Sequence, residues 1–469
     1  MMNNYNNTTF YKINLQKAIQ QLSSFIRIPS VSAEPKHKKD VADCANWLAN
    51  HLKQVGLEHI KVIPTKKHPL VYADWIHAPG KATLLIYGHY DVQPVDPVNE
   101  WNDNPFSGFV KGNYIFGRGS SDDKGQLFVH IKALQYYLET FHKLPINIKC
   151  IFEGEEEIGS ENLLRFLDTN SSLLRSDVAV VSDMRILSPV QPAITYSLRG
   201  MLSVELEVKG QDHDLHSGNF GGAVCNPLEA LCQIISKLHN RNGKITIPGF
   251  YNNVLRRGYI ERDYMQSRGP SDNAILCDAG AEYPCGESGY SLYERISIRP
   301  SLSINGITGG YQGEGPKAII HSKASAKLSF RLVPNQNPEK IYELFKNFIH
   351  LNTPKAVKSS VKKVGSAHSV LSDINNKYIE LASLAYKKAF RKQPLFLASG
   401  GTIPIVAALR QKLGIPVVLM GFALPDDNLH APNERFYIPN FHKGINTSME
   451  FIRLISLEQL VNVNSNQYS

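Results

Sequence analysis

Four short apolar runs stand out in the pattern of hydrophobic and polar positions. They are ATLLIYG at 82–88, INIKCIFEG at 146–154, DVAVVSD at 177–183 and GIPVVLMGF at 414–422. Each run is rich in Val, Ile or Leu and is bounded by Gly, Pro or Asp, which is typical of buried strands. Helical stretches alternate with the runs in the first half of the chain. The pattern therefore predicts an α/β fold with a mostly parallel sheet flanked by helices.

The pattern changes between Arg199 and about Ser366. Its elements follow the order strand, helix, strand, strand, helix, strand: MLSVELEVKG, NPLEALCQIISKLHN, SLSINGI, KASAKLSFRLV, PEKIYELFKNFIHL and AVKSSVKKV. This is the order of a ferredoxin-like α+β unit. We therefore predict a first domain built from residues 1–198 and 367–469, with a second domain, 199–366, inserted into it. The polar, Arg- and Tyr-rich stretch at 240–300 interrupts the second domain, and the pattern assigns no regular structure to it.

Composition narrows the classes of function. The formal charge of +9 raises the question of nucleic acid, but the basic runs are short and lie among acidic residues, and no nucleic-acid-binding module is present. The start of the chain lacks the apolar core of a signal peptide, and no run of about 18 apolar residues occurs. The six cysteines show no C-x-x-C spacing. We expect a cytoplasmic protein that binds neither nucleic acid nor a membrane.

Residues able to bind metal follow the four apolar runs. His89 follows the first run, Glu156 and Glu157 follow the second, Asp183 ends the third, and His430 lies eight residues after the fourth. Open parallel sheets bind their ligands beyond the carboxyl ends of the strands. Four separate segments therefore bring candidate ligands to one edge of one sheet.

Asp122 adds a fifth contribution, in the Gly-rich turn GRGSSDDKG before a helical stretch. A carboxylate at this position also gains from the helix dipole. Two imidazoles and three carboxylates form a set suited to two divalent ions, with zinc preferred and manganese or cobalt as alternatives. One carboxylate would then bridge the two ions.

The adjacent Glu156 and Glu157 need separate roles, because consecutive residues of a strand point to opposite faces. Gly154 and Gly159 indicate that the strand has ended at this point. One Glu would bind metal, and the other would take a proton from a water molecule made acidic by the metals.

Each of these residues also has an ordinary interpretation. His89 by itself reads as a polar residue after a strand, Asp122 as a helix N-cap, residues 155–157 as a solvated acidic turn, and Asp183 as a turn residue. Their joint occurrence at the ends of successive predicted strands favours the metal site.

The motifs GHYDVQP, GRGSSDDKG, EGEEEIGS, VVSD and NLHAPNE together resemble those of the M20 family of metallopeptidases. The resemblance is greatest to the dipeptidase branch of that family and covers nearly the whole chain. It extends to FIRIPSVSAEP, DLHSGNFGG, GYQGEGPKAII, RLVPNQNPE and SGGTIP. It implies a zinc-peptidase-like catalytic domain with an inserted lid and dimerisation domain, and a substrate that is a dipeptide or short peptide.

The resemblance also implies a ligand assignment. Asp122 would bridge two metal ions, His89 and Asp183 would complete one site, and Glu157 and His430 would complete the other.

Two further roles near the metals follow from the same resemblance. Glu156 would be the general base that activates the bridging water. Asp91 would be the carboxylate that fixes the imidazole of His89, as histidines that bind metal commonly require.

In the inserted domain the resemblance implies that His216 reaches the active site of the partner subunit in a homodimer and stabilises the oxyanion. Arg331 would hold the carboxylate of the substrate, for which its fork of donors is suited. Thr402 would lie near that carboxylate, where the branch usually has Ser.

Two departures from the branch bear on substrate preference. Ala398 and Ser399 stand where an Arg-Glu pair is common, and Ala318 stands where carnosinase-like members have Thr. The metal chemistry is untouched by these changes. The main alternative function is a deacylase of N-acyl amino acids from the same family, of the acetylornithine deacetylase or succinyl-diaminopimelate desuccinylase type. A binding or scaffold protein with a degenerate site is a second alternative, which the presence of Glu156 disfavours.

Overall fold

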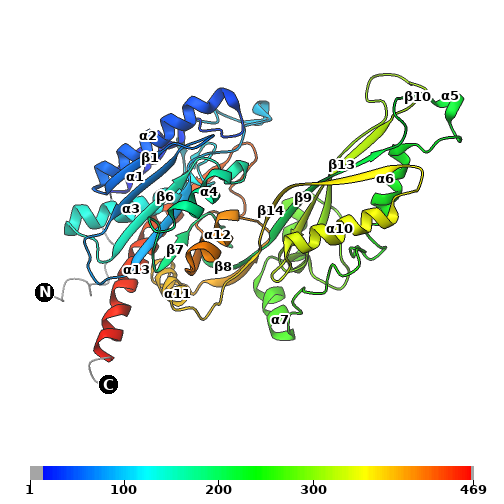
Figure 1. The fold of residues 1–469 in the computed structure, drawn as a ribbon. Helices are drawn as coiled ribbons and strands as arrows, with labels where there is room; N and C mark the ends of the chain where they lie inside the picture. The colour runs from blue at the N-terminus through cyan, green and yellow to red at the C-terminus, as the bar shows by residue number, and fades with distance from the viewer. Residues whose placement is uncertain (1–13, 466–469) are drawn as a thin grey trace. The chain divides into compact units, whose positions relative to one another are not determined.

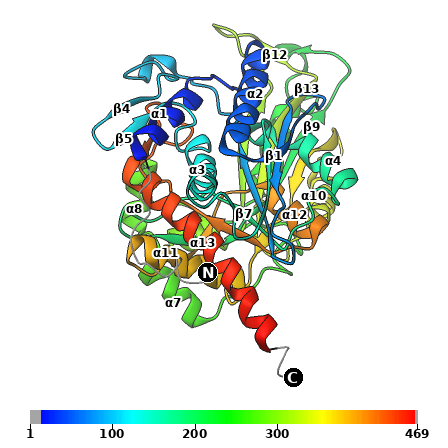
Figure 2. The same cartoon turned by 90° about the vertical axis from the view of Figure 1, so that its left-hand side faces the viewer.

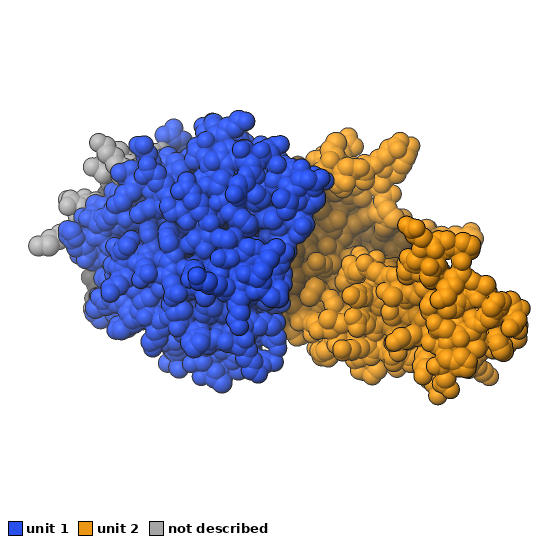
Figure 3. All heavy atoms as spheres, turned by 90° about the horizontal axis from the view of Figure 1, so that it is seen from above, with its two compact units in different colours: residues 1–196, 372–397, 408–469 blue, residues 197–371, 398–407 orange. Residues whose placement is uncertain are grey.

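The computed structural model describes residues 14–465, and the chain divides into two compact units (Figures 1 and 3). Unit 1 comprises the chain up to Tyr196, Ser372–Leu397 and the chain from Ala408 onward. Unit 2 comprises Ser197–Leu371 and Ala398–Ala407, so a short stretch that the sequence analysis placed in the first domain is part of unit 2. Residues 1–13, on which the expectation about a signal peptide rests, lie outside the described residues.

A mixed sheet of nine strands has most of its residues in unit 1, in the order β1-β2-β6-β3-β7-β17-β8-β15, with β16 paired to β8. Strand β15 and the last two residues of β8 and of β16 belong to unit 2. Strands β6, β3, β7 and β17 run parallel, and the pairs toward both edges are antiparallel. The four parallel strands are the four apolar runs of the sequence. The strands of this sheet are β1 (Glu58–Ile63), β2 (Leu70–Trp75), β3 (Thr83–His89), β6 (Asn147–Glu153), β7 (Val178–Val181), β8 (Ala193–Leu198), β15 (Val370–Leu371), β16 (Leu395–Ser399) and β17 (Val417–Met420).

Helices cover both faces of this sheet. Figure 2 shows α3, α11 and α13 on one side of the strands and α4 and α12 on the other. Alternate strand residues such as Leu84 and Ile86 are fully buried in the larger core, together with Leu127 and Ile131 of α3. The helices of unit 1 are α1 (Leu15–Ile26), α2 (Lys38–Val55), α3 (Lys124–Phe141), α4 (Glu161–Asn170), α11 (Lys377–Phe390), α12 (Pro404–Leu413) and α13 (Ile438–Ser465), with the 3-10 turns η1 (Pro35–His37), η2 (Val98–Glu100) and η3 (Glu156–Ile158). The first four residues of α12 are counted with unit 2.

A small antiparallel sheet closes one side of unit 1, with the order β18-β5-β4. Its strands are β4 (Phe109–Lys111), β5 (Tyr114–Phe116) and β18 (Arg435–Tyr437). This sheet joins the segment after His430 to the segment before Asp122. None of the helices among residues 14–465 combines the length and the apolar character that crossing a bilayer requires.

Unit 2 has the ferredoxin-like arrangement that the sequence predicts. Its four-stranded antiparallel sheet has the order β11-β13-β9-β14 and packs against α6 and α10 around an apolar core. The elements are β9 (Gly200–Lys209), α6 (Pro227–Ser236), β11 (Ser301–Thr308), β13 (Lys323–Leu332), α10 (Pro338–Asn352) and β14 (Lys358–Ala367). A separate two-stranded pair, β10 (Leu215–His216) with β12 (Ile319–Ile320), and the short helix α5 (Ser217–Phe220) complete this part of the unit.

Residues 240–300 contain three short helices to which the hydrophobic pattern assigned no regular structure. They are α7 (Tyr259–Arg268), α8 (Asp272–Ala279) and α9 (Leu292–Ser297). Helix α7 buries only Met265, and α8 buries no residue. Neither helix therefore shows in its sequence the apolar periodicity by which a helix is recognised. Helix α9 begins with a capping box in which Ser291 and Glu294 satisfy each other's backbone N–H groups.

Candidate metal centre

The parallel strands of unit 1 end beside one another. Where β3 pairs with β6, His89 lies opposite Glu153. Where β3 pairs with β7, Tyr87 lies opposite Val181. The residues that follow these strands therefore emerge at one edge of the sheet, which is where open α/β sheets place their sites.

At this edge the five predicted ligands lie together. Two groups have ligand atoms within 4.8 Å of one another: His89 with Asp122 and Asp183, and Asp122 with Glu157 and His430. Asp122 belongs to both groups. Its Oδ1 lies 3.2 Å from Nε2 of His89, and its Oδ2 lies 2.9 Å from Nε2 of His430. Nε2 of His430 is also 3.3 Å from Oε1 of Glu157.

These groups fit divalent cations on two grounds. Nε2 of His89 and Oε1 of Glu157 are buried and make no hydrogen bond within the described part of the chain, which is costly for polar atoms unless a cation completes them. Ligands about 2.0–2.1 Å from a tetrahedral zinc are about 3.3 Å apart. The separations of 2.9–3.3 Å between these atoms are close to that value.

Asp91 ties the first histidine to the following glutamates. Nδ1 of His89 lies 3.1 Å from the Asp91 carbonyl oxygen and 3.4 Å from its Oδ1. The Asp91 carboxylate also accepts hydrogen bonds from the backbone N–H groups of Glu156 and Glu157, each at 3.2 Å. Because Nδ1 is directed to Asp91, Nε2 of His89 is left to face Asp122. Asp91 thus orients both the histidine and the turn η3.

Glu156 begins η3, three residues after the last residue of β6, Glu153. Burial raises the pKa of its carboxyl well above the ordinary value, although the charge of His89 acts in the opposite direction, and Asp183 and Glu157 raise it further. A carboxylate with a raised pKa is a better proton acceptor than an ordinary glutamate.

The charges around the cluster shift the pKa values of its members. Asp122 and Glu157 raise the pKa of His430 to about 10. Burial, together with Asp122 and Asp123, raises the pKa of Asp183 well above its ordinary value. The cluster therefore concentrates negative charge that protons or cations must compensate.

The sequence analysis assigned no role to Glu434, which anchors the loop that carries Asp122. Its fully buried carboxylate accepts backbone hydrogen bonds from Gly119, Ser121 and Asp122 at 2.9–3.1 Å and pairs with Arg118 at 2.8 Å. Glu434 stands four residues after His430 in the quoted motif NLHAPNE, and its acidic character within that motif was the available signal.

Two glycines permit the close packing around this loop. A Cβ on Gly125, in the first turn of α3, would lie 2.0 Å from the carbonyl oxygen of Ser120 and 2.6 Å from the ring of Phe436. A Cβ on Gly154 would lie 2.7 Å from the hydroxyl of Tyr90. Both approaches are shorter than side chains tolerate, so larger residues would displace the loops that carry Asp122 and Glu156.

The other candidate site residues lie in unit 2. His216 is exposed at the end of β10, and its Nδ1 accepts a hydrogen bond from Gly218 N–H at 3.0 Å. A neutral histidine whose Nδ1 accepts carries its proton on Nε2. Nε2 of His216 is therefore a donor.

Arg331 and Thr402 lie together in unit 2, although the sequence analysis placed Thr402 in the first domain. Nη1 of Arg331 donates to Oγ1 of Thr402 at 2.8 Å, and that hydroxyl donates to the carbonyl oxygen of Arg199 at 2.7 Å. Burial and the charge of Arg331 lower the pKa of Arg199 to about 10. Two guanidinium groups thus lie near each other, which favours an anion.

Comparison with known proteins agrees with this chemistry. The profile described as Peptidase family M20/M25/M40 matches residues 85–454. The chain is a member of this family. It is therefore a hydrolase of the metallopeptidase class, and the resemblance found in its motifs is confirmed. Members of this family use divalent metal ions.

Three relatives illustrate the similarity across the M20/M25/M40 family. Cys-Gly metallodipeptidase DUG1 of Candida albicans is 30% identical over 472 residues, covering 94% of this chain and 97% of the relative. The crystal structure of the M20 family metallo-carboxypeptidase Sso-CP2 from Sulfolobus solfataricus has a TM-score of 0.86 with 33% identity, covering 94% and 99% of the two chains. Human carnosine dipeptidase 1 has a TM-score of 0.80 with 27% identity, covering 94% and 96%.

Proposed function

We propose that this M20 member is a metallo-dipeptidase that hydrolyses the peptide bond of dipeptides with a free C-terminal carboxylate. The observation that carries the proposal is the pair of ligand groups that share Asp122, next to the partly buried carboxyl of Glu156. The names of relatives from Candida albicans and Homo sapiens as dipeptidases support it.

We assign two divalent ions to the centre, zinc by preference, with manganese or cobalt as alternatives. His89, Asp122 and Asp183 would hold one ion, and Asp122, Glu157 and His430 the other. Bound there, the ions would supply the Lewis acidity that lowers the pKa of a water molecule toward neutrality. Asp91 would keep His89 in the ligating orientation through the contacts at Nδ1.

Glu156 is the proposed general base. Its carboxylate would accept a proton from the attacking water and pass that proton to the amine that leaves when the peptide bond breaks. Asp91 supports this role, because its carboxylate holds the backbone N–H of Glu156 at 3.2 Å.

Arg331 and Thr402 are the proposed contacts of the substrate carboxylate. Arg331 already directs one donor to the Thr402 hydroxyl and retains further N–H groups for a carboxylate. A substrate without a charged C-terminus would leave this partly buried cation unpaired, which predicts a strong preference for free dipeptides.

His216 is proposed to donate a hydrogen bond from Nε2 to the oxyanion that forms when water attacks the peptide carbonyl. The oxyanion would lie in the active site of the partner subunit, in a homodimer formed through the lid domain. The hydrogen bond from Gly218 supports this role because it fixes the tautomer with a proton on Nε2. Mixing inactive Glu156→Gln protein with inactive His216→Ala protein tests it. Activity should return in mixed dimers, which contain one intact site, and its absence would refute a role in trans.

The first experiment tests the base. Glu156→Gln should retain its metal content and lose about 10²–10⁴-fold in kcat on a dipeptide such as Cys-Gly. Glu161→Gln is the matched control, since Glu161 is an exposed residue of α4 nearby in the chain, and it should keep full turnover. Undiminished hydrolysis by Glu156→Gln would refute the assignment.

The second experiment separates related activities. A panel of Ala-Ala, Cys-Gly, Leu-Gly, acetylornithine and succinyl-diaminopimelate distinguishes a dipeptidase from the deacylase alternative. Longer peptides belong in the same panel, because Sso-CP2 is described as a carboxypeptidase. Metal analysis of the purified protein would identify the native ions. The dipeptidase proposal fails if an acyl amino acid is the best substrate.

We also propose a cytoplasmic location. The support is that all six cysteines are free thiols, including the exposed Cys232, Cys277 and Cys285, as is usual in a reducing compartment. Fractionation of the source cells with immunodetection tests this, and enrichment in a secreted or membrane fraction would contradict it.

A further inference from the structure

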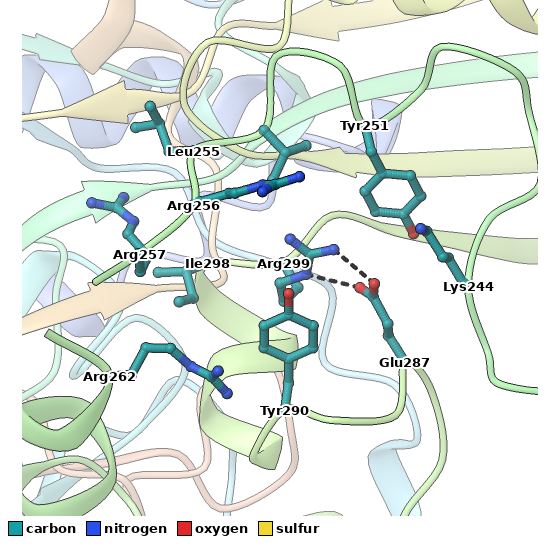
Figure 4. Close-up of a pocket in the computed structure, with 11 residues that line it drawn as sticks. Lys244, Tyr251, Leu255, Arg256, Arg257, Arg262, Glu287, Tyr290, Ile298 and Arg299 are labelled. Carbon is teal, nitrogen blue, oxygen red and sulfur yellow. Dashed lines mark hydrogen bonds and ion pairs between the residues drawn. The ribbon is translucent and has the colours of Figure 1, made fainter. Parts of the chain in front are cut away.

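A cavity of about 450 Å³ opens in unit 2, within the region to which the sequence pattern assigned no structure. Its walls come from Lys244 to Arg257, from α7, and from the segment between Glu287 and Arg299 (Figure 4). The residues that line it include none of the proposed metal ligands and none of the proposed substrate contacts. The cavity is therefore a separate feature of this unit.

The lining is strongly cationic. Glu287 is its single carboxylate, against five basic side chains: Lys244, Arg256, Arg257, Arg262 and Arg299. Three of the arginines have acidic partners: Arg299 pairs with Glu287 at 2.7 Å, Arg262 with Glu294 at 2.5 Å and Arg257 with Glu261 at 2.9 Å. Lys244 and Arg256 make no ion pair with any described residue. Two positive charges are thus left over at the cavity.

Aromatic rings lie against three of the five cations, Lys244, Arg262 and Arg299. Cations and rings alternate in one stack in the order Lys244, Tyr251, Arg299, Tyr290 and Arg262. The distances from each cation to the centre of the adjacent ring are 4.9, 5.2, 4.4 and 4.9 Å along the stack. Each cation is attracted to the face of the adjacent ring. The stack therefore keeps positive charges close to one another without needing one carboxylate for every cation. Such an arrangement attracts anions from solution.

The cavity also offers a neutral donor and a few apolar side chains. The Tyr251 hydroxyl accepts a hydrogen bond from Ile245 N–H at 3.1 Å, so its own proton is available to a ligand. Leu255 and Ile298 lie across the cavity from Lys244 and Glu287 (Figure 4). A ligand that matches both the cationic and the apolar residues of the cavity has at least two negative charges joined to a small apolar group.

We infer that this cavity binds a small organic dianion, such as a phosphate ester or an aromatic dicarboxylate. The test is calorimetric titration of the full-length protein with phenyl phosphate and, separately, with phthalate. At least one probe should bind, and the tighter of the two identifies the kind of anion. Binding should weaken as salt is added, because the attraction is electrostatic.

Variants localise the binding. Lys244 and Arg256 are exposed, so the double variant Lys244→Gln/Arg256→Gln should fold, which circular dichroism would verify. It should bind the probe about tenfold more weakly or worse, as expected for the loss of charge-assisted contacts. Arg241→Gln is the matched control, an exposed arginine of the same segment that does not line the cavity, and it should bind as the wild type does. Equal affinity in the wild type and the double variant, or no binding of either probe, would overturn the inference.

Discussion

The backbone N–H of Asp122 donates a hydrogen bond of 3.1 Å to the buried carboxylate of Glu434. The proposed bridging ligand is thus held in place by a residue that lies far along the chain and has no place in either ligand group. Because Glu434 also binds the backbone of Gly119 and Ser121, one side chain sets the shape of the whole turn.

This relationship predicts the effect of Glu434→Gln. An amide offers one acceptor atom in place of two, so part of the turn would lose its hydrogen bonds and Asp122 would be less well positioned. We expect metal affinity to fall about 10–100-fold, as is usual when a residue that supports a ligand is changed. Competition with a zinc chelator measures it. Glu100→Gln, an exposed change, is the control, and equal metal affinity in both variants would contradict the prediction.

A second prediction concerns Asp91. In Asp91→Asn, an amide nitrogen cannot accept the hydrogen bond that one carboxylate oxygen now receives from Glu156 or Glu157. We expect kcat/KM to fall about 10–100-fold while the thermal midpoint changes little. Steady-state kinetics and a melting curve check this. A loss of activity that merely follows a loss of folded protein would instead indicate a purely structural role.

A third prediction concerns the substrate carboxylate. Arg331→Lys loses the planar fork, and we expect kcat/KM for a dipeptide to fall about 10–100-fold, equivalent to about 1.5–3 kcal/mol for a hydrogen bond to a charged group. Hydrolysis of the corresponding dipeptide amide, already slow, should change far less. The comparison of the two substrates is the measurement, and an equal loss on both would show that Arg331 does not recognise the carboxylate.

A fourth prediction concerns pH and Lys132, which is buried in unit 1. Burial lowers its pKa from 10.5 to about 7. Its Nζ contacts Gln21, Gln135 and Nε2 of His51 at 2.6–2.9 Å. Below the lowered pKa the folded state bears the full cost of a buried charge. Between the two pKa values the unfolded chain binds more protons, so this group makes the free energy of unfolding rise with pH.

Lys132→Met removes that dependence. The wild type should gain stability relative to the variant as the pH is raised from about 7 to about 9.5. The difference, the free energy of unfolding of Lys132→Met minus that of the wild type, should therefore fall over this range. Urea denaturation at several pH values measures the difference. Lys53→Met, at an exposed position on α2, serves as the control and should show no such trend. A parallel pH profile for the wild type and Lys132→Met would contradict the prediction.

The sequence predicted the parts of the fold that rest on strong apolar patterns. The four central strands are short continuous runs, and the six elements of the ferredoxin-like unit bury regular faces. Strand β2 is also buried throughout, yet its sequence LVYADW contains Asp74, which hides it from a search for apolar runs. Asp74 is accommodated because the hydroxyl of Tyr72 donates to it at 2.7 Å.

Most of the candidate ligands could be proposed for the same reason, since His89, Glu157, Asp183 and His430 follow the four recognisable strands, whereas Asp122 was proposed from its Gly-rich turn before a helix. Glu434 was missed because its role depends on hydrogen bonds to backbone groups more than 300 residues earlier in the chain, which no local pattern records. The cationic cavity was missed because it is built from short helices and loops with little apolar periodicity.

Unit 2 contains a second, later stretch of the chain, Ala398–Ala407, and this has a practical consequence for protein engineering. A gene fragment that encodes 197–371 would appear to contain the whole inserted domain, yet it would lack Thr402. The Arg331 guanidinium would lose the hydroxyl to which it donates, a partner 71 positions away in the chain. Exchange of this unit between relatives would therefore require two grafts, and a chimaera made with one would separate this arginine from its partner.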